Sequence, residues 1–177
     1  MPVIFPDVPT AQGNVKVAFV TTMAIPGEPT VAELGAVGVV DASFIITEGN
    51  WAPSAEANRG TAPRRLGSKR QFESFGAVTE AIADLVYVVD PQAASGSDEK
   101  KLYELLDDGA ELYAVERLGL DAETDAFAIG DVVNTYPIRV SVPTITGDTS
   151  DEFAEFIVTQ AVAVRAPGAY RDFEITA

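Results

Sequence analysis

The sequence predicts a mainly β domain, a sandwich or barrel flanked by one α-helix, and three observations support this. Most apolar stretches alternate with polar residues at every second position, as half-buried strands do. Only one stretch has leucines at helical spacing, and turns rich in Gly and Pro separate the rest at short intervals. The 177 residues, 47% of them hydrophobic, suit one folded domain.

The expected strands run from residue 14 to residue 165. Alternation is clearest in 14–22 and 111–118, and β-branched and aromatic residues dominate 82–90. Further strands are expected within 36–47, 68–79, 127–143 and 152–165, with turns at 119–125 and 145–150 and a loop at 24–34. Residues 1–13 carry three prolines and are expected to form an extended N-terminal arm, followed by a single domain of residues 14–177.

One helix is predicted at about residues 97–108. Leu102, Leu105 and Leu106 would share one face of it. Ser97 is a good N-cap, two acidic residues follow in the first turn, and Gly109 comes after the end. The sequence therefore places this helix between two strands.

A basic interval lies inside a long loop expected at about residues 48–70. No acid occurs between Glu56 and Glu73, although the net charge of the chain is -15. The interval holds five of the 12 basic residues: Arg59, Arg64, Arg65, Lys69 and Arg70. A local patch of opposite sign on an acidic body favours docking to a second copy in a fixed register. A mobile surface loop without a role is the alternative.

Trp51 stands at the approach to this interval. Tryptophan and arginine are among the residue types most enriched at interface hot spots. A long loop in a compact domain is also typically functional or disordered. We therefore expect Trp51 to belong to the same contact surface.

The composition excludes several kinds of chemistry. The chain has no Cys and no His, which removes disulfides, thiolate chemistry, Ser-His-Asp triads and His/Cys zinc sites. The segment 121–125 loosely resembles a calcium loop, but Ala126 and Val132 stand where that pattern needs Gly and Glu. The acid pairs 107–108 and 151–152 lack the aromatic platform of a glycosidase. We expect no enzyme activity, no metal and no cofactor.

The chain is not expected to insert into a membrane or to bind nucleic acid. No apolar run reaches the about 20 residues that a span needs, and the first residues do not form a secretory signal. The absence of cysteine fits production in a reducing cytoplasm. An acidic surface repels phosphates, whereas nucleic-acid binding rests on neutralising them.

The order of features resembles a known family. The phrases that carry the resemblance are ITEGNWAPSAEAN, RRLGSKRQFESFG, LVYVVDPQ, LYAVERLGLD and DAFAIGDVVNTYPIRV, with the helix between the third and the fourth. From about Val15 to Val164 the chain resembles the major tail tube protein of long, non-contractile bacteriophage tails, particularly those of phages that infect actinobacteria.

The resemblance implies a structural virion protein. Family members build a β-sandwich flanked by a helix, and six copies close into a ring whose sheets join into an inner barrel. Rings stack into a tube through which DNA passes, and the long loop reaches the adjacent ring. The implied partners are further copies and the tape-measure, tail terminator and tail tip proteins. The implied locations are the virion tail and, during assembly, the host cytoplasm.

The acidic balance suits such a conduit. Six copies would carry 6 × (-15), or -90, per ring before titration. DNA should slide through a negative lumen without binding. The basic residues, with Trp51, would then lie at the contacts between rings. Candidate acidic partners are Asp107, Asp108, Asp148, Asp151 and Glu152, and candidate lumen residues are Glu73, Glu80 and Glu155.

Two other functions stay open at this point. A tail terminator or head–tail joining protein of the same fold type would form a single ring that does not stack. A carbohydrate-binding β-sandwich module would need exposed aromatic residues on one face.

Overall fold

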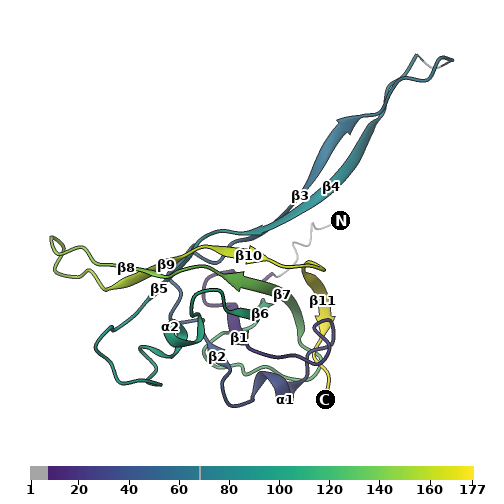
Figure 1. The fold of residues 1–177 in the computed structure, drawn as a ribbon. Coiled ribbons are helices and arrows are strands. Elements are labelled where there is room, and N and C mark those ends of the chain that lie inside the picture. The colour runs from purple at the N-terminus through teal and green to yellow at the C-terminus, as the bar shows by residue number, and fades with distance from the viewer. Residues whose placement is uncertain (1–7, 68) are drawn as a thin grey trace, which may run out of the picture.

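A computed structural model describes residues 8–67 and 69–177, and its fold is mainly β, as predicted (Figure 1). In chain order the elements are β1 (Val15–Val20), α1 (Val31–Leu34), β2 (Val40–Asp41), β3 (Pro53–Thr61), β4 (Glu73–Ile82), β5 (Leu85–Val88), α2 (Lys101–Leu105), β6 (Glu111–Leu118), β7 (Val132–Val140), β8 (Thr144–Thr146), β9 (Ile157–Gln160), β10 (Val162–Val164) and β11 (Tyr170–Glu174).

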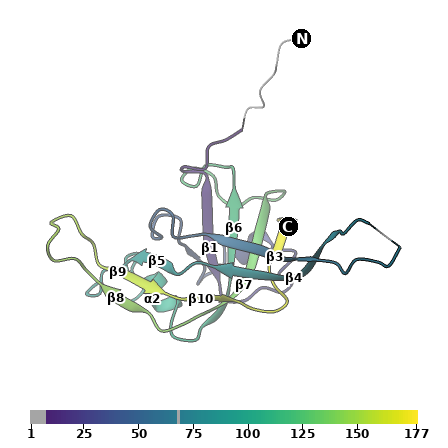
Figure 2. The same ribbon diagram turned by 90° about the horizontal axis from the view of Figure 1, so that it is seen from above.

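Three antiparallel sheets make up the chain. The largest has the order β10-β7-β6-β1-β2, and β11 pairs with the same edge of β7 as β10, at residues further towards the start of β7. A second sheet has the order β5-β9-β8 and packs on one face of the first. The third sheet is the pair β3-β4, which projects from the body in both ribbon views (Figures 1 and 2).

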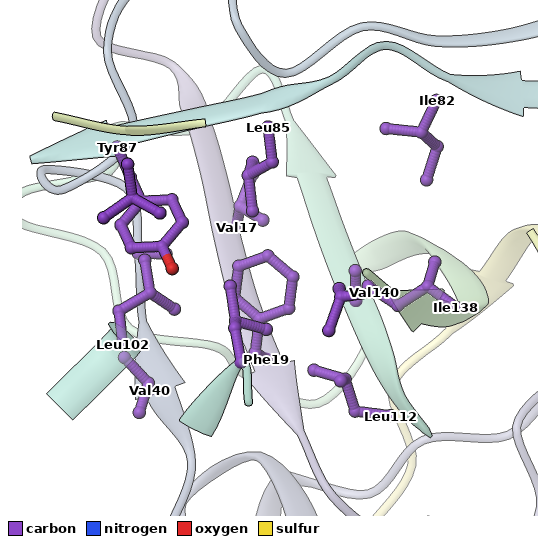
Figure 3. Packing of buried hydrophobic residues seen from close by; sticks show 14 of the residues in the cluster. Val17, Phe19, Val40, Ile82, Leu85, Tyr87, Leu102, Leu112, Ile138 and Val140 are labelled. Carbon is purple, nitrogen blue, oxygen red and sulfur yellow. The ribbon is translucent and has the colours of Figure 1, made fainter. Parts of the chain in front are cut away.

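The main core lies between the two larger sheets (Figure 3). Val17 and Phe19 of β1 reach it from one sheet, Leu85 and Tyr87 of β5 from the other, and Leu102 of α2 closes one end. Every one of these side chains is buried. The alternation of β1 and β5 is what puts their apolar residues on this face.

The other face of the large sheet is covered as well. Val20, Val115 and Val133 pack there with Leu34 of α1 and Ile175 near the C-terminus. A capping box at Thr30 and Glu33 begins α1: Glu33 N donates to Thr30 Oγ1, and Thr30 N donates to Glu33 Oε2. This short helix was missed within the predicted loop 24–34, because four residues show no helical period.

The predicted helix exists but is shorter than 97–108. It begins at Lys101, and Lys100 in the cap position makes no side-chain cap bond. The Ser97 hydroxyl is buried without a hydrogen-bond partner, so the predicted Ser97 cap is wrong. Turns occupy the preceding residues instead, and Lys100 Nζ donates to the carbonyls of Pro91 and Ala93 there.

The middle of the predicted loop 48–70 is a strand. β3 occupies Pro53–Thr61 and pairs with β4, so only residues 62–72 connect the two strands. Alternation was hidden here because the hairpin is exposed on most of both faces and polar side chains occur at every phase. Elsewhere, 36–47 keeps only the short strand β2, and 152–165 is split into β9 and β10 by Ala161. The turn predicted at 145–150 overlaps β8, and β11 was not predicted.

The expected extended arm of residues 1–13 falls partly outside the described residues. Of the described part, residues 11–13 form a turn that leads into β1. Asn14 N donates to the Ala11 carbonyl at 3.1 Å, and its side-chain amide donates to the Thr10 carbonyl at 2.8 Å.

Candidate assembly surface

The projecting hairpin consists of β3, β4 and the residues that connect them, 62–67 and 69–72, which we call the hairpin tip. An isolated two-stranded sheet is at best marginally stable in water and leaves strand edges unpaired. Besides β3, the strand with which β4 makes its main contacts is β10. The outer part of the hairpin therefore has the character of a surface that a partner covers.

One face of the projecting hairpin carries exposed apolar side chains among its charged ones. The register pairs Ala57 with Val78 and Arg59 with Phe75, so these four side chains share a face. Val78 is 62% exposed and Phe75 is 68% exposed. Towards the base the same face reaches the buried Ile82, which pairs with Pro53. Glu80 lies between Val78 and Ile82 on this face, so the exposed apolar strip consists of Ala57, Phe75 and Val78 and is separated from the core by a carboxylate.

A β-bulge keeps Phe75 and Val78 on that face. The register shifts by one residue between the pairs Ala57–Val78 and Arg59–Phe75, which places the extra residue at Gly76–Ala77. Sequence reasoning missed the apolar strip because Phe75 and Val78 are out of phase in a regular strand. The signal that could have found it is Gly76, a residue typical of bulges.

The predicted basic residues are brought together at the outer end of the hairpin. Arg59 lies on β3, with its guanidinium 5.5 Å from the centre of the Phe75 ring. Arg64, Arg65, Lys69 and Arg70 are exposed in the hairpin tip. Leu66, also in the tip, is fully exposed, and Phe72 is 66% exposed. Cations and large exposed apolar side chains therefore lie together at this end.

Trp51 does not lie with them. It packs at the base of the hairpin, edge-on to Phe19 at 6.1 Å and to Tyr136 at 5.9 Å between ring centres. Its Nε1 donates to Glu116 Oε1 at 2.8 Å. Glu116 is buried and also accepts from Asn134 Nδ2 and the Tyr136 hydroxyl. The inter-ring role of Trp51 stays a prediction, while the contacts show that the ring fixes where β3 leaves the body.

Glu80 secures β4 to the C-terminal part of the chain. Its Oε2 accepts from Ala169 N at 2.6 Å, and its Oε1 lies 3.5 Å from Arg171 Nη2. Gly168 has a φ of +105°, and a Cβ there would lie 2.5 Å from Glu80 Oε2. Only glycine suits both the conformation and the close approach. The base of the hairpin is thus held on both strands.

The three candidate lumen residues are dispersed. Glu73 is exposed where β4 begins, next to the hairpin tip. Glu80 is half-buried and engaged with its own chain, as described above. Glu155 is exposed between β8 and β9 and lines a surface pocket with Phe156. Their assignment to a lumen stays a prediction.

The candidate acidic partners fall in two places, both exposed. Asp107 and Asp108 follow α2, and Asp148, Asp151 and Glu152 lie in the turn between β8 and β9. A hydrogen bond from the Ser150 hydroxyl holds the pKa of Asp148 below its ordinary value, so this carboxylate is negative at neutral pH. The β8–β9 turn projects from the end of the body that lies opposite the hairpin (Figures 1 and 2).

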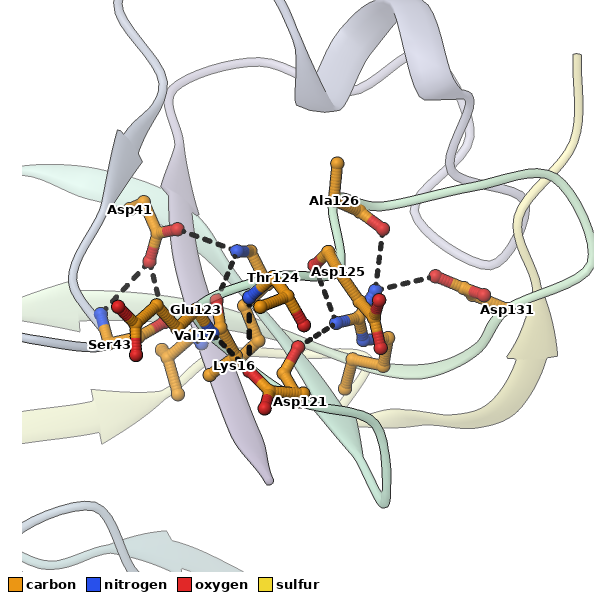
Figure 4. Close-up of polar contacts among 12 residues, drawn as sticks. Lys16, Val17, Asp41, Ser43, Asp121, Glu123, Thr124, Asp125, Ala126 and Asp131 are labelled. Carbon is orange, nitrogen blue, oxygen red and sulfur yellow. Dashed lines mark hydrogen bonds and ion pairs between the residues drawn. The ribbon is translucent and has the colours of Figure 1, made fainter. Parts of the chain in front are cut away.

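The loop that loosely resembles a calcium site holds Arg117 instead, and Figure 4 labels the residues that accept from it. The Arg117 side chain is 1% exposed, and its guanidinium donates to the carbonyls of Asp121, Asp125 and Ala126 and to Asp131 Oδ2. These oxygens face a guanidinium, so the segment is a structural turn. Across residues 8–67 and 69–177, no group of three or more acidic side chains is placed to hold a metal ion.

Comparison with known proteins decides the family. A family model described as phage tail tube protein matches residues 1–169. The chain belongs to the phage tail tube protein family. This tail tube protein is therefore a structural component of a virion tail, and its family is not one of enzymes. No curated protein matches the chain.

A solved structure supports the fold of this tail tube protein. A chain of the anti-feeding prophage baseplate, from a cryo-EM structure with six-fold symmetry imposed, is similar over 93% of this chain and 97% of its own. The TM-score is 0.52 and the sequence identity is 10%, so the likeness concerns the fold alone. None of the helices in the described parts of the tail tube protein has the length and apolar character to cross a membrane.

Proposed function

We propose that copies of this chain close into rings, six to a ring, and that the rings stack into the tube of a long, non-contractile phage tail. The projecting hairpin is the observation that carries this proposal. Family membership supports the tube, and the six-fold symmetry of the similar baseplate supports the ring number. The resemblance to tails of phages of actinobacteria supports the tail type.

The hairpin supports stacking because of its position and surface. It leaves the body on a fixed base and carries an apolar strip and a cationic end well away from the core. A contact between one end of a subunit and a different surface of the next is heterologous, and such a contact closes a ring or extends a filament. The hairpin thus suits the contact from one ring to the next.

The charge supports the use of the tube as a DNA conduit. The net charge of -15 per copy repels phosphates, while the cations concentrate on a surface that a neighbouring copy would cover. We infer that DNA passes without specific binding, with Glu73, Glu80 and Glu155 as candidates for the lumen. The further partners would be the tape-measure, tail terminator and tail tip proteins, and assembly would take place in the host cytoplasm.

Electron microscopy of the concentrated, purified chain tests the proposal. We expect tubes or stacked rings of the wild type, and folded but unstacked protein from the pair Arg64→Glu and Arg65→Glu. The charge-preserving pair Arg64→Lys and Arg65→Lys is the matched control and should stack. Isolated rings of the wild type would favour a tail terminator or joining protein, and normal tubes from the charge-reversed pair would remove the hairpin from the contact.

A further inference from the structure

A pocket lies at the end of the body opposite the projecting hairpin. Its volume is about 320 Å³. It is lined by two kinds of side chain: apolar Ile45, Val88, Val89 and Phe156, and acidic Asp90, Asp98, Glu99 and Glu155. These come from the segment after β2, from β5 and the residues that follow it, from the turns before α2 and from the segment before β9. Figures 1 and 2 both place α2 and β9 away from the hairpin. We call it the acidic pocket.

Most of the carboxylates that line the acidic pocket are not neutralised by a cation of the described part of the same chain. Lys101 pairs with Asp98 at 2.7 Å, and Lys100 is turned to the carbonyls of Pro91 and Ala93. Within the described part of the chain, Asp90, Glu99 and Glu155 form no ion pair. An apolar surface surrounded by carboxylates suits an apolar side chain whose neighbouring residues are cationic.

Phe156 is held in place as part of this pocket. Its ring lies over Gly147, where an added Cβ would come within 2.9 Å of Cδ1. Phe156 itself is 56% exposed. An aromatic ring that is packed from behind and exposed in front is typical of an interface anchor.

The hairpin tip has the complementary pattern. Leu66 is fully exposed, and Arg64, Arg65 and Lys69 flank it in the sequence. An apolar side chain surrounded by cations at one end of the chain thus matches an apolar pocket surrounded by anions at the other. Two hairpin tips would repel each other, because the tip carries only cations. Two β8–β9 turns would also repel each other, because that turn carries only anions.

We propose that the hairpin tip of one copy inserts Leu66 into the acidic pocket of another copy. The inference rests on the proposed assembly and specifies its contact. It makes Glu99 and Glu155 the acceptor residues, in place of the β8–β9 turn acids Asp151 and Glu152, and moves Glu155 from the lumen to the interface. Because tip and pocket lie at opposite ends, the contact is heterologous and propagates from copy to copy.

Charge exchange tests the contact. The pair Glu99→Lys and Glu155→Lys should raise the protein concentration needed for assembly by at least about tenfold, as close charge reversal at an interface does. Adding Arg64→Glu and Arg65→Glu to the same chain should restore assembly to within about threefold of the wild type, because each contact is again between opposite charges. The matched control Asp151→Lys and Glu152→Lys carries the same charge change outside the pocket and should assemble normally.

Each outcome decides between the proposals. Absence of any wild-type assembly would overturn the proposed function itself. Two outcomes would overturn only the pocket contact, provided that the wild type forms tubes. One is normal assembly of the variant with Glu99→Lys and Glu155→Lys. The other is a quadruple variant that assembles no better than either double variant.

Cross-linking gives an independent test, because the chain has no cysteine. A chain that carries both Leu66→Cys and Glu155→Cys, and is otherwise wild type, should form disulfide-linked multimers once it has assembled. Leu66→Cys combined with Asp151→Cys is the control and should link much less. Equal linking of both, or none of the first, would contradict the contact.

Discussion

At the scale of single residues, Trp51 fixes the origin of the projecting hairpin. Its ring packs edge-on to Phe19 and Tyr136, and its Nε1 donates to the buried Glu116. A carboxylate that is buried away from water needs hydrogen-bond donors. Trp51 supplies one of the three donors that Glu116 has. A residue type frequent in interfaces thus serves the fold of its own subunit.

Trp51→Ala should lower the free energy of unfolding by about 2 to 4 kcal/mol, since it removes a large half-buried ring and a hydrogen bond to a charged group. Trp51→Phe keeps most of the packing and should lose about 1 to 2 kcal/mol. Urea unfolding of the monomer measures both values. Equal losses from the two variants would mean that packing contributes little.

Asp41 makes stability depend on pH. Burial acts to raise its pKa, but hydrogen bonds from Ser43 and the 3.0 Å ion pair with Lys16 outweigh it, so the pKa lies below the ordinary value. The ionised form is therefore favoured by folding. Its stabilising contribution is present above the unfolded pKa of about 3.9 and is lost as the pH falls through the lower folded pKa.

Asp41→Asn should remove this dependence. We expect the wild type to exceed the variant in unfolding free energy by more at pH 7 than at pH 3, because pH 3 lies below the unfolded pKa of about 3.9, where the unfolded chain takes up the proton and part of the contribution is lost. Urea unfolding at both pH values measures the difference. A constant difference would show that the ionisation of Asp41 does not contribute.

At the scale of elements, the projecting hairpin depends on its base. Two strands without further neighbours are marginal, so the anchors at Ile82, Glu80 and Trp51 hold the direction of the rest. Glu80 is the anchor that links β4 to the turn before β11.

Gly168→Ala should release this anchor. The new Cβ would press on Glu80 Oε2 and force a φ of +105° on alanine, at a cost of about 1 to 3 kcal/mol. Hydrogen exchange of the amides near Glu80 should become faster. Gly60→Ala is the matched control on the hairpin, because nothing lies within 4 Å of an added Cβ there. Unchanged exchange in the Gly168 variant would contradict a role for the anchor.

At the scale of the whole molecule, net charge opposes assembly and local contacts must overcome it. Each copy carries -15, so copies repel at long range. Salt shortens the Debye length from about 30 Å at 0.01 M to about 8 Å at 0.15 M, which screens distant repulsion more than close ion pairs.

Raising the salt concentration from about 0.01 M to about 0.15 M should therefore speed wild-type assembly. Light scattering at fixed protein concentration measures the rate. The Lys69→Glu variant has a weaker local attraction and a greater net negative charge. It should assemble more slowly than the wild type at low salt, and salt should increase its assembly rate by a larger factor. A wild-type rate that falls over this range would mean that long-range attraction, rather than repulsion, governs encounter.

The success of sequence reasoning followed the burial of each element. β6 was predicted at its observed bounds, Glu111–Leu118, because both faces of its sheet are covered and its pattern is regular. The helix was placed correctly by its leucines, yet its start was wrong because the Ser97 hydroxyl makes no cap bond and only the Ser97 carbonyl accepts, from Lys100 N and Lys101 N. The sequence of the projecting hairpin predicts a loop, because exposed strands need no alternation.

The sequence by itself determined the fold class, the absence of cysteine and histidine chemistry, and the concentration of cations in one interval of an acidic chain. These are properties of composition and local pattern. Only the tertiary structure decided that the interval ends a rigidly based hairpin, that Trp51 packs inward, and that an apolar pocket with an acidic rim lies at the far end. Such juxtapositions depend on strand register and on residues distant in the sequence, which no local pattern encodes.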